Sequence, residues 1–220
     1  MYLLGTNVLA LIPVVGIMVA LILVPPLTVG MMAAARAASA GAAPRLAMLA
    51  EGLRTATRAQ LALGIVYLAC SMLIFAAMSA ADESGALRDL MTGQQPSAEA
   101  DLEALLFPVA VFAALYLPVS MMFWFSPPLA AWHATGAARA LFFSFVACLL
   151  NWRAFLAYGA SVVVMMVVVP GLALLALRLF VALDLRMAAV SLVFPFLVLM
   201  LPTLFASFYV SYRDVFGTKV

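Results

Sequence analysis

Two places in the sequence combine side chains that could act on a lipid headgroup. His133 follows Trp132 near the end of one apolar run, and Tyr212, Arg213 and Asp214 close the last one. Histidine titrates near neutral pH and can transfer a proton, as a lipid-modifying enzyme would need. The same residue types also anchor helices at a membrane boundary, because aromatic rings and arginines favour the headgroup region. We interpret both places as interfacial anchors, with Asp214 neutralising Arg213.

The sequence contains no motif that would support catalysis more directly. It has no Gly-x-Ser-x-Gly elbow, His-Glu-x-x-His helix, P-loop, dinucleotide fingerprint or Cys-x-x-Cys-His haem attachment. A lone histidine cannot form a zinc site without cysteines or carboxylates nearby. The apolar runs carry no ionisable residue at their centres, where a proton- or sodium-coupled transporter would need one. The sequence therefore predicts a non-enzymatic protein without catalytic residues, metal or cofactor.

The composition identifies lipid as the solvent of this chain. Of its 220 residues, 68% are hydrophobic and 9% are charged, and the mean hydropathy is +1.22. Soluble domains have about 45–50% apolar and about 25% charged residues, so a soluble or disordered chain is excluded. Two cysteines, Cys70 and Cys148, cannot build a disulfide framework, and we interpret both as packing residues. A net charge of +2 gives no indication of a nucleic-acid partner.

Long uncharged runs predict an all-α bundle of about six membrane segments. The runs cover residues 1–35, 59–81, 104–138, 154–177 and 187–212. A helix needs about 20 apolar residues to cross a bilayer, and each run exceeds that length. The first run contains Ile12-Pro13-Val14-Val15-Gly16, which predicts a tight turn between a stub of eleven residues and a helix over 14–36 that passes through Pro25-Pro26. The alternative is one helix over 2–24, followed by a proline break and an interfacial segment.

Two further segments are predicted to lie in the membrane plane on the cytoplasmic side. Residues 45–58 place Glu51, Arg54, Thr55 and Arg58 at helical spacing, with Leu46, Leu49 and Leu53 on the opposite face. Residues 136–152 combine Arg139, Ser144 and Asn151 with several aromatic side chains. We expect an interfacial helix over the first stretch and an interfacial or re-entrant helix over the second.

Prolines and basic residues give the expected shape and orientation of the spans. Ten of the twelve prolines lie in apolar segments, which predicts kinked helices. The kinks could serve as hinges or could let the helices pack with complementary shapes.

The basic residues predict the orientation of the chain. If the C-terminus is cytoplasmic, the cytoplasmic side holds eight basic residues and the other side three, in agreement with the excess of Lys and Arg in cytoplasmic loops. The eight are Arg36, Arg45, Arg54, Arg58, Arg139, Arg153, Arg213 and Lys219, and the three are Arg88, Arg178 and Arg186. Residues 82–103 then form an acidic external loop that lacks the ligand spacing of a calcium site.

A pattern that occurs twice suggests a parallel repeat within one membrane domain, residues 1–220. Each copy has Pro-Pro-Leu, a stretch of small residues with an arginine, a predicted in-plane helix, a second arginine and a new span. The copies begin at Pro25 and Pro127, so the repeat would divide the chain into about 1–100 and 101–220.

Several of these stretches also carry a resemblance. Residues 123–129, Trp132-His133, residues 138–145 with Asn151, and residues 209–216 resemble a family of proteobacterial six-helix inner-membrane proteins of uncharacterised function. The resemblance covers the whole chain and implies a fold and a compartment, the bacterial inner membrane. Similar proteins carry a basic N-terminal segment and a full first helix before the Ile-Pro-x-x-Gly stretch, so the first helix here is expected to be incomplete. The candidate interfacial or functional residues are Trp124, Trp132, His133, Arg139, Asn151, Tyr212, Arg213 and Asp214.

Three functions remain open from the sequence. The first is a non-enzymatic membrane protein that acts through membrane lipid, another membrane protein or a second copy of itself. The second is an uncoupled transporter or permeation path for an uncharged or amphipathic solute, which predicts a polar cavity lined by Ser71, Ser120, Ser161 or Thr203. The third is a lipid-modifying enzyme, which predicts that His133 or the residues Tyr212, Arg213 and Asp214 converge in one pocket.

Overall fold

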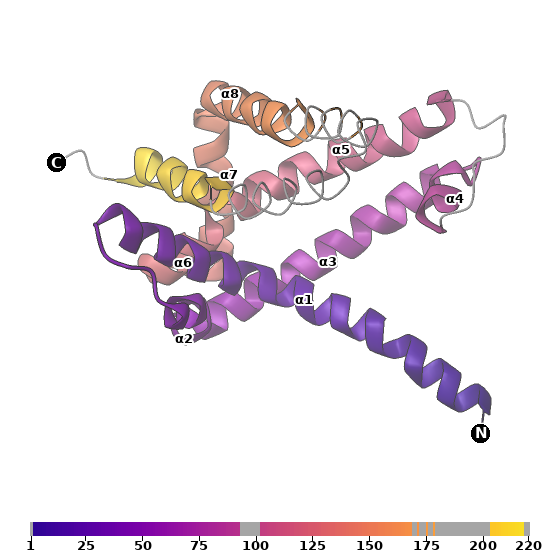
Figure 1. Cartoon of the computed structure of the whole chain (residues 1–220), viewed down its shortest axis with the longest axis horizontal. Coiled ribbons are helices and arrows are strands. Elements are labelled where there is room, and N and C mark those ends of the chain that lie inside the picture. The colour runs from indigo at the N-terminus through magenta and orange to yellow at the C-terminus, as the bar shows by residue number, and fades with distance from the viewer. Residues whose placement is uncertain are drawn as a thin grey trace. The chain divides into compact units, whose positions relative to one another are not determined.

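The computed structural model describes residues 2–92, 102–168, 171, 175, 178 and 203–217, and this part of the chain is helical without strands. The predicted all-α fold is confirmed (Figure 1). The elements are α1 (Tyr2–Ser39), the 3-10 turn η1 (Leu46–Ala50), α2 (Glu51–Arg54), α3 (Thr57–Ala81), α4 (Ala86–Thr92), α5 (Leu102–Trp124), α6 (Ser126–Trp132), α7 (Ala137–Leu150), α8 (Trp152–Val163) and the π-helical turn η2 (Val164–Val168). Residues 203–216 form a further helix.

The N-terminal run forms one helix, so the predicted turn at residues 12–16 is wrong. The alternative of a break after residue 24 is also wrong, because α1 continues through Pro25 and Pro26. A turn in lipid would leave several backbone donors and acceptors unpaired, whereas each proline removes a single N–H. The Thr28 hydroxyl donates to the Val24 carbonyl oxygen at 2.8 Å, next to the proline pair.

The predicted single helix over 45–58 is also wrong, because the chain turns between α2 and α3. Ala56 has a φ of 52°, the left-handed region that an α-helix cannot contain. The Thr55 and Thr57 hydroxyls donate to the Glu51 and Leu53 carbonyl oxygens at 2.7 and 2.9 Å, and the Thr55 N–H also donates to the Glu51 oxygen at 2.8 Å. These bonds tie the two threonines to the backbone of the short α2. Residues 45–58, hereafter the connecting segment, therefore form two short turns followed by the start of α3.

Among the residues that the structure describes, three helical stretches are long and apolar enough to cross a membrane: Val15–Ser39, Thr57–Ala81 and Ala104–Trp132. The third combines α5 and α6. Together, α7 and α8 would make a fourth span, bent by 86° between them. The helix predicted over 136–152 is present as α7. Six membrane segments stay a prediction, because the run 187–212 is described only from residue 203.

The chain divides into two compact units, and the first consists of Met1–Gly30 and Arg45–Val146. Within this unit α3 packs along α5, and its N-terminal part also contacts α2 and α6 (Figure 1). The ring centroids of Tyr67 and Phe123 lie 5.0 Å apart in an edge-to-face arrangement. Leu63 and Phe125 are fully buried, so the core of this unit lies near the start of α3 and the end of α5. The predicted two-fold repeat stays a prediction.

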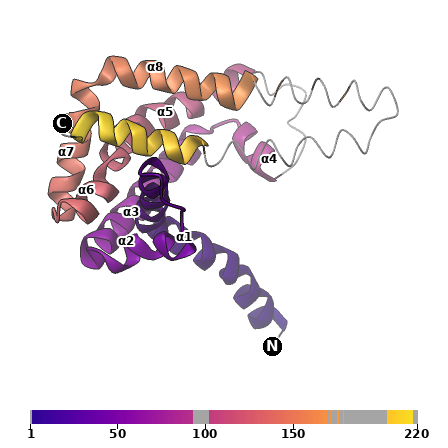
Figure 2. The ribbon, with the colours of Figure 1, turned by 60° about the vertical axis from the view of Figure 1, so that its left-hand side comes forward.

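The second unit consists of Met31–Pro44 and Ala147–Val220. Here α8 lies beside the helix 203–216, which is yellow in Figures 1 and 2. The Tyr158 hydroxyl lies 2.6 Å from the Ser207 hydroxyl, and Ser207 donates to the Leu204 carbonyl oxygen of its own helix. The Tyr158 ring also contacts Phe208, with centroids 6.4 Å apart. An aromatic and hydroxyl contact therefore joins these two helices.

The acidic residues that precede α4 have a structural role at its start. The Asp82 carboxylate accepts hydrogen bonds from the backbone N–H groups of Leu87 and Arg88, at 3.2 and 3.1 Å. These donors belong to the first turn of α4, where a helix cannot pair them internally. Asp82 therefore caps a short helix in the described part of the predicted acidic loop.

Candidate functional site

The candidate site begins where α5 ends and α6 begins. Pro127 and Pro128 occupy the first turn of α6, where a missing N–H costs little. The Ser144 hydroxyl of α7 accepts from the Phe125 N–H at 2.9 Å and donates to the Met121 carbonyl oxygen at 2.7 Å. An uninterrupted helix would join these two backbone groups to each other. A buried side chain from another helix therefore bridges the break.

A buried amide lies against the same break. The Gln60 side chain, 1% exposed, donates from Nε2 to the Pro127 carbonyl oxygen at 2.8 Å. Gln60 Oε1 and the hydroxyl of Ser126 are buried, and no hydrogen-bond partner for either is present among the described residues. A buried polar group is costly in lipid unless it is paired, so the hydrogen bond from Gln60 to Pro127 helps to fix how α3 and α6 meet. Gln60, Ser126 and Ser144 form what we call the polar cluster.

Three glycines of the first unit, Gly30, Gly52 and Gly64, bring backbones into direct contact. A methyl group added at Gly64 would overlap the Ile22 carbonyl oxygen of α1. That carbonyl is the one left without its helical donor by Pro26. In the same way, a methyl at Gly52 would overlap the carbonyl oxygen of Pro26. Small residues let helix backbones approach closely, and Cα–H groups then face carbonyl oxygens.

The third of these glycines holds the connecting segment. A methyl at Gly30 would overlap the Leu49 carbonyl oxygen in η1. With Gly52, this contact places the backbone of η1 and α2 directly on α1 near its proline pair. The connecting segment is therefore fixed through its main chain, which leaves its side chains available for other contacts.

A tryptophan ties the connecting segment to α6. Trp132 Nε1 donates to Glu51 Oε1 at 2.9 Å in a partly buried position. A hydrogen bond to a carboxylate is stronger than one between neutral groups. This contact joins residues that are far apart in sequence, so the sequence alone did not indicate it.

A double-mutant cycle would measure this contact. We expect Trp132→Phe and Glu51→Ala to show a coupling free energy of about 1 kcal/mol, because each removes the same hydrogen bond. The measurement is the unfolding free energy of the full chain in detergent for both single variants and the double variant. Glu51→Gln retains an acceptor oxygen and serves as the control, with a loss smaller than that of Glu51→Ala. Strictly additive effects would show that the hydrogen bond contributes nothing.

The other candidates in the first unit lie on different elements. Trp124 is the last residue of α5 and is half-buried. His133 follows α6 with an exposed side chain, and its backbone N–H donates to the Leu129 carbonyl oxygen at 3.1 Å. Arg139 is exposed in the first turn of α7. The side-chain hydrogen bond of Trp132 to Glu51, reported above, joins α6 to the connecting segment.

The remaining candidates belong to the second unit. Asn151 lies at the bend between α7 and α8, and its Nδ2 donates to the Ala147 carbonyl oxygen at 2.8 Å. Tyr212 is 8% exposed. Arg213 and Asp214 form an exposed ion pair with 3.4 Å between the nitrogen and oxygen atoms. The neighbouring charges of Arg213 and Asp214 therefore pair with each other.

The described polar side chains bond mainly to backbone. Ser120 and Ser161, which the sequence suggested as cavity residues, donate to the Leu117 and Ala157 carbonyl oxygens of their own helices. Within the ranges that the structure describes, no group of three or more His, Cys, Asp or Glu residues could hold a metal ion. The hydrogen bonds of the described polar side chains therefore position helices.

Sequence reasoning missed the residues that build the site. Gln60 lies at the start of an uncharged run, and a polar amide there is the signal that could have indicated a buried contact. Gly30, Gly52 and Gly64 carried a weaker signal, as small residues beside large apolar ones. Ser144 was noticed as polar, but its position between Met121 and Phe125 depends on how α7 folds back.

The comparisons with known proteins give one relative. A Burkholderia thailandensis protein named "Probable inner membrane protein BTH_II0599" is 35% identical to this chain over an alignment of 226 residues, gaps included, and the alignment covers 99% of this chain and 82% of that protein. No family model matches the chain, and no solved structure matches it.

Proposed function

This chain belongs to the family of the probable inner membrane protein BTH_II0599, and from that premise we propose that it acts without catalysis, through bound lipid or protein. The predicted resemblance to an inner-membrane family is confirmed by this relationship. We also propose that the C-terminus is cytoplasmic, because eight basic residues against three favour that orientation.

One observation carries the proposal. Two buried polar side chains of the first unit make their hydrogen bonds to the protein's own backbone: Gln60 donates to the Pro127 carbonyl oxygen, and Ser144 bonds to Met121 and Phe125. A catalytic site would need polar groups that converge on a substrate. Groups that hold helices in one arrangement instead favour a role in which the surface of the bundle, rather than its interior, meets other molecules.

The test is to identify what stays bound to the protein. The full chain would be extracted directly into native nanodiscs, and its contents would be identified by mass spectrometry. We expect a defined lipid or a stoichiometric protein to be retained. A bare protein that lets an uncharged solute cross proteoliposome membranes would instead support the alternative, an uncoupled permeation path. Turnover of a lipid headgroup that is lost in His133→Ala would support a lipid-modifying enzyme and contradict the proposal.

A further inference from the structure

We propose that the connecting segment is a binding surface for the headgroups of anionic phospholipids, formed by Arg45, Arg54 and Arg58. This inference rests on the proposed function and names the partner class at one surface. Arg45 precedes η1, Arg54 ends α2 and Arg58 lies in the first turn of α3. Because α3 is a candidate span that begins at Thr57, these residues stand at one end of it, the depth of the headgroups.

The surface carries positive charges that are exposed and can bind an anionic ligand. Arg45, Arg54 and Arg58 are all exposed, and no described residue forms an ion pair with any of them. The segment contains a single carboxylate, Glu51, which accepts the hydrogen bond from Trp132. Guanidinium groups bind phosphate oxygens in a fixed fork geometry, and anionic lipid attracts basic residues near the membrane surface.

The backbone beneath the arginines is already ordered. Leu49 and Gly52 lie in backbone contact with Gly30 and Pro26 of α1. The Thr55 hydroxyl closes the end of α2 on the Glu51 carbonyl oxygen. A lipid that binds here would therefore not have to order the main chain, which reduces the entropic cost of binding.

Exposed leucines on the segment fit the same partner. The Leu46 side chain is 87% exposed and that of Leu53 is 40% exposed. In water such exposure would be unfavourable, whereas at the boundary of headgroups and acyl chains an apolar side chain beside a cation is favourable. A lipid supplies both surfaces that the segment offers, because it joins a phosphate to an acyl chain.

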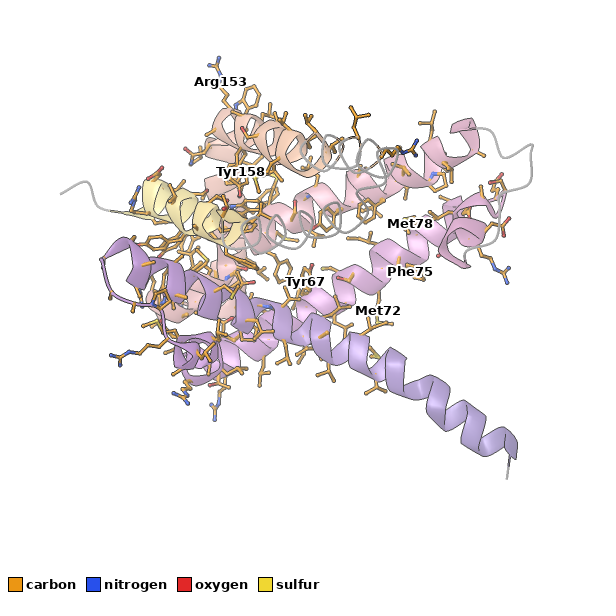
Figure 3. The ribbon with its side chains drawn as sticks, in the orientation of Figure 1. Tyr67, Met72, Phe75, Met78, Arg153 and Tyr158 are labelled. Carbon is orange, nitrogen blue, oxygen red and sulfur yellow. The ribbon has the colours of Figure 1, made fainter. Side chains whose placement is uncertain are left out.

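The experiment compares lipid binding by three forms of the full chain in neutral detergent. Each form is titrated with phosphatidylglycerol and with phosphatidylcholine, and bound lipids are counted by native mass spectrometry. The test variant is Arg45→Gln/Arg54→Gln/Arg58→Gln. The control variant is Arg88→Gln/Arg153→Gln/Arg178→Gln, which removes the same charge from other exposed positions; Figure 3 shows Arg153 pointing away from α8.

We expect the wild type and the control to prefer phosphatidylglycerol, and the test variant to lose that preference by about tenfold or more. The test variant should keep the apparent unfolding temperature of the wild type, because its substituted side chains are exposed. An equal loss in both variants would show attraction to net charge alone and would overturn the proposal, as would an unchanged preference in the test variant. Retention of a protein partner without any anionic-lipid preference would overturn this inference and leave the proposed function standing.

Discussion

Gly64→Ala is expected to lower the apparent unfolding temperature of the full chain in detergent, with a loss of about 2–3 kcal/mol in stability. The added methyl group would overlap the Ile22 carbonyl oxygen of α1, which belongs to the backbone and cannot rotate away. Relief therefore requires α1 and α3 to separate along their contact. Because lipid provides no hydrophobic drive to hold them together, close packing is the main attraction that the variant loses.

A matched substitution on α1 controls for the effect of alanine on helix propensity. Gly16→Ala is expected to leave the unfolding temperature unchanged or slightly higher, because nothing lies within 4 Å of the added methyl group. Both variants would be compared with the wild type by thermal unfolding and by the monodisperse fraction after purification. Equal behaviour of Gly64→Ala and Gly16→Ala would show that the backbone contact between α1 and α3 does not stabilise the protein.

Ser144→Ala should be the second most damaging change, with a loss of about 2 kcal/mol. The substitution removes two hydrogen bonds at once, one from the Phe125 N–H and one to the Met121 carbonyl oxygen. Ser144 and Phe125 are fully buried, so water cannot replace the lost hydroxyl in these two hydrogen bonds unless the helices rearrange. The break between α5 and α6 would lose the side chain that bridges it.

Ser120→Ala is the control for this prediction. The Ser120 hydroxyl also donates a hydrogen bond to a backbone carbonyl oxygen, that of Leu117, but this bond lies within one helix and is exposed. We expect its loss to change the unfolding free energy by less than about 0.5 kcal/mol. A Ser144→Ala variant as stable as Ser120→Ala, measured by thermal unfolding in the same detergent, would show that the α5–α6 break needs no bridge from α7.

The sequence predicted helices better than it predicted their ends. The uncharged run 59–81 corresponds to α3, Thr57–Ala81, because charged residues cannot easily enter the hydrocarbon region. Proline was an uneven guide to breaks. The turn predicted around Pro13 is wrong, whereas the predicted passage of the helix through Pro25-Pro26 is correct, and the second proline pair starts α6 at a break. The two proline pairs have similar local sequences, because each is followed by leucine within an apolar run. At the second pair, the Ser144 and Gln60 side chains bond to the backbone of the break between α5 and α6, a contact that no local pattern indicates.

The candidate site was predictable only in part. Trp132 was singled out as an aromatic residue at a boundary, and it does make a contact between elements, with Glu51. His133 was singled out with it, yet its side chain is exposed next to α6. No spacing in the sequence connects Trp132 to a glutamate on the connecting segment, because the two approach only when α6 and α2 both pack on α3.

Composition by itself determined that this protein is an all-α membrane protein, since the exclusion of charge from long runs is a local property that survives any packing. Tertiary structure alone decided which glycines carry backbone contacts, Gly64 rather than Gly16, and which serine is buried, Ser144 rather than Ser120. In a soluble helix the apolar stripe marks the inner face. In lipid both faces of a helix are apolar, so the sequence pattern does not show which face meets its neighbours.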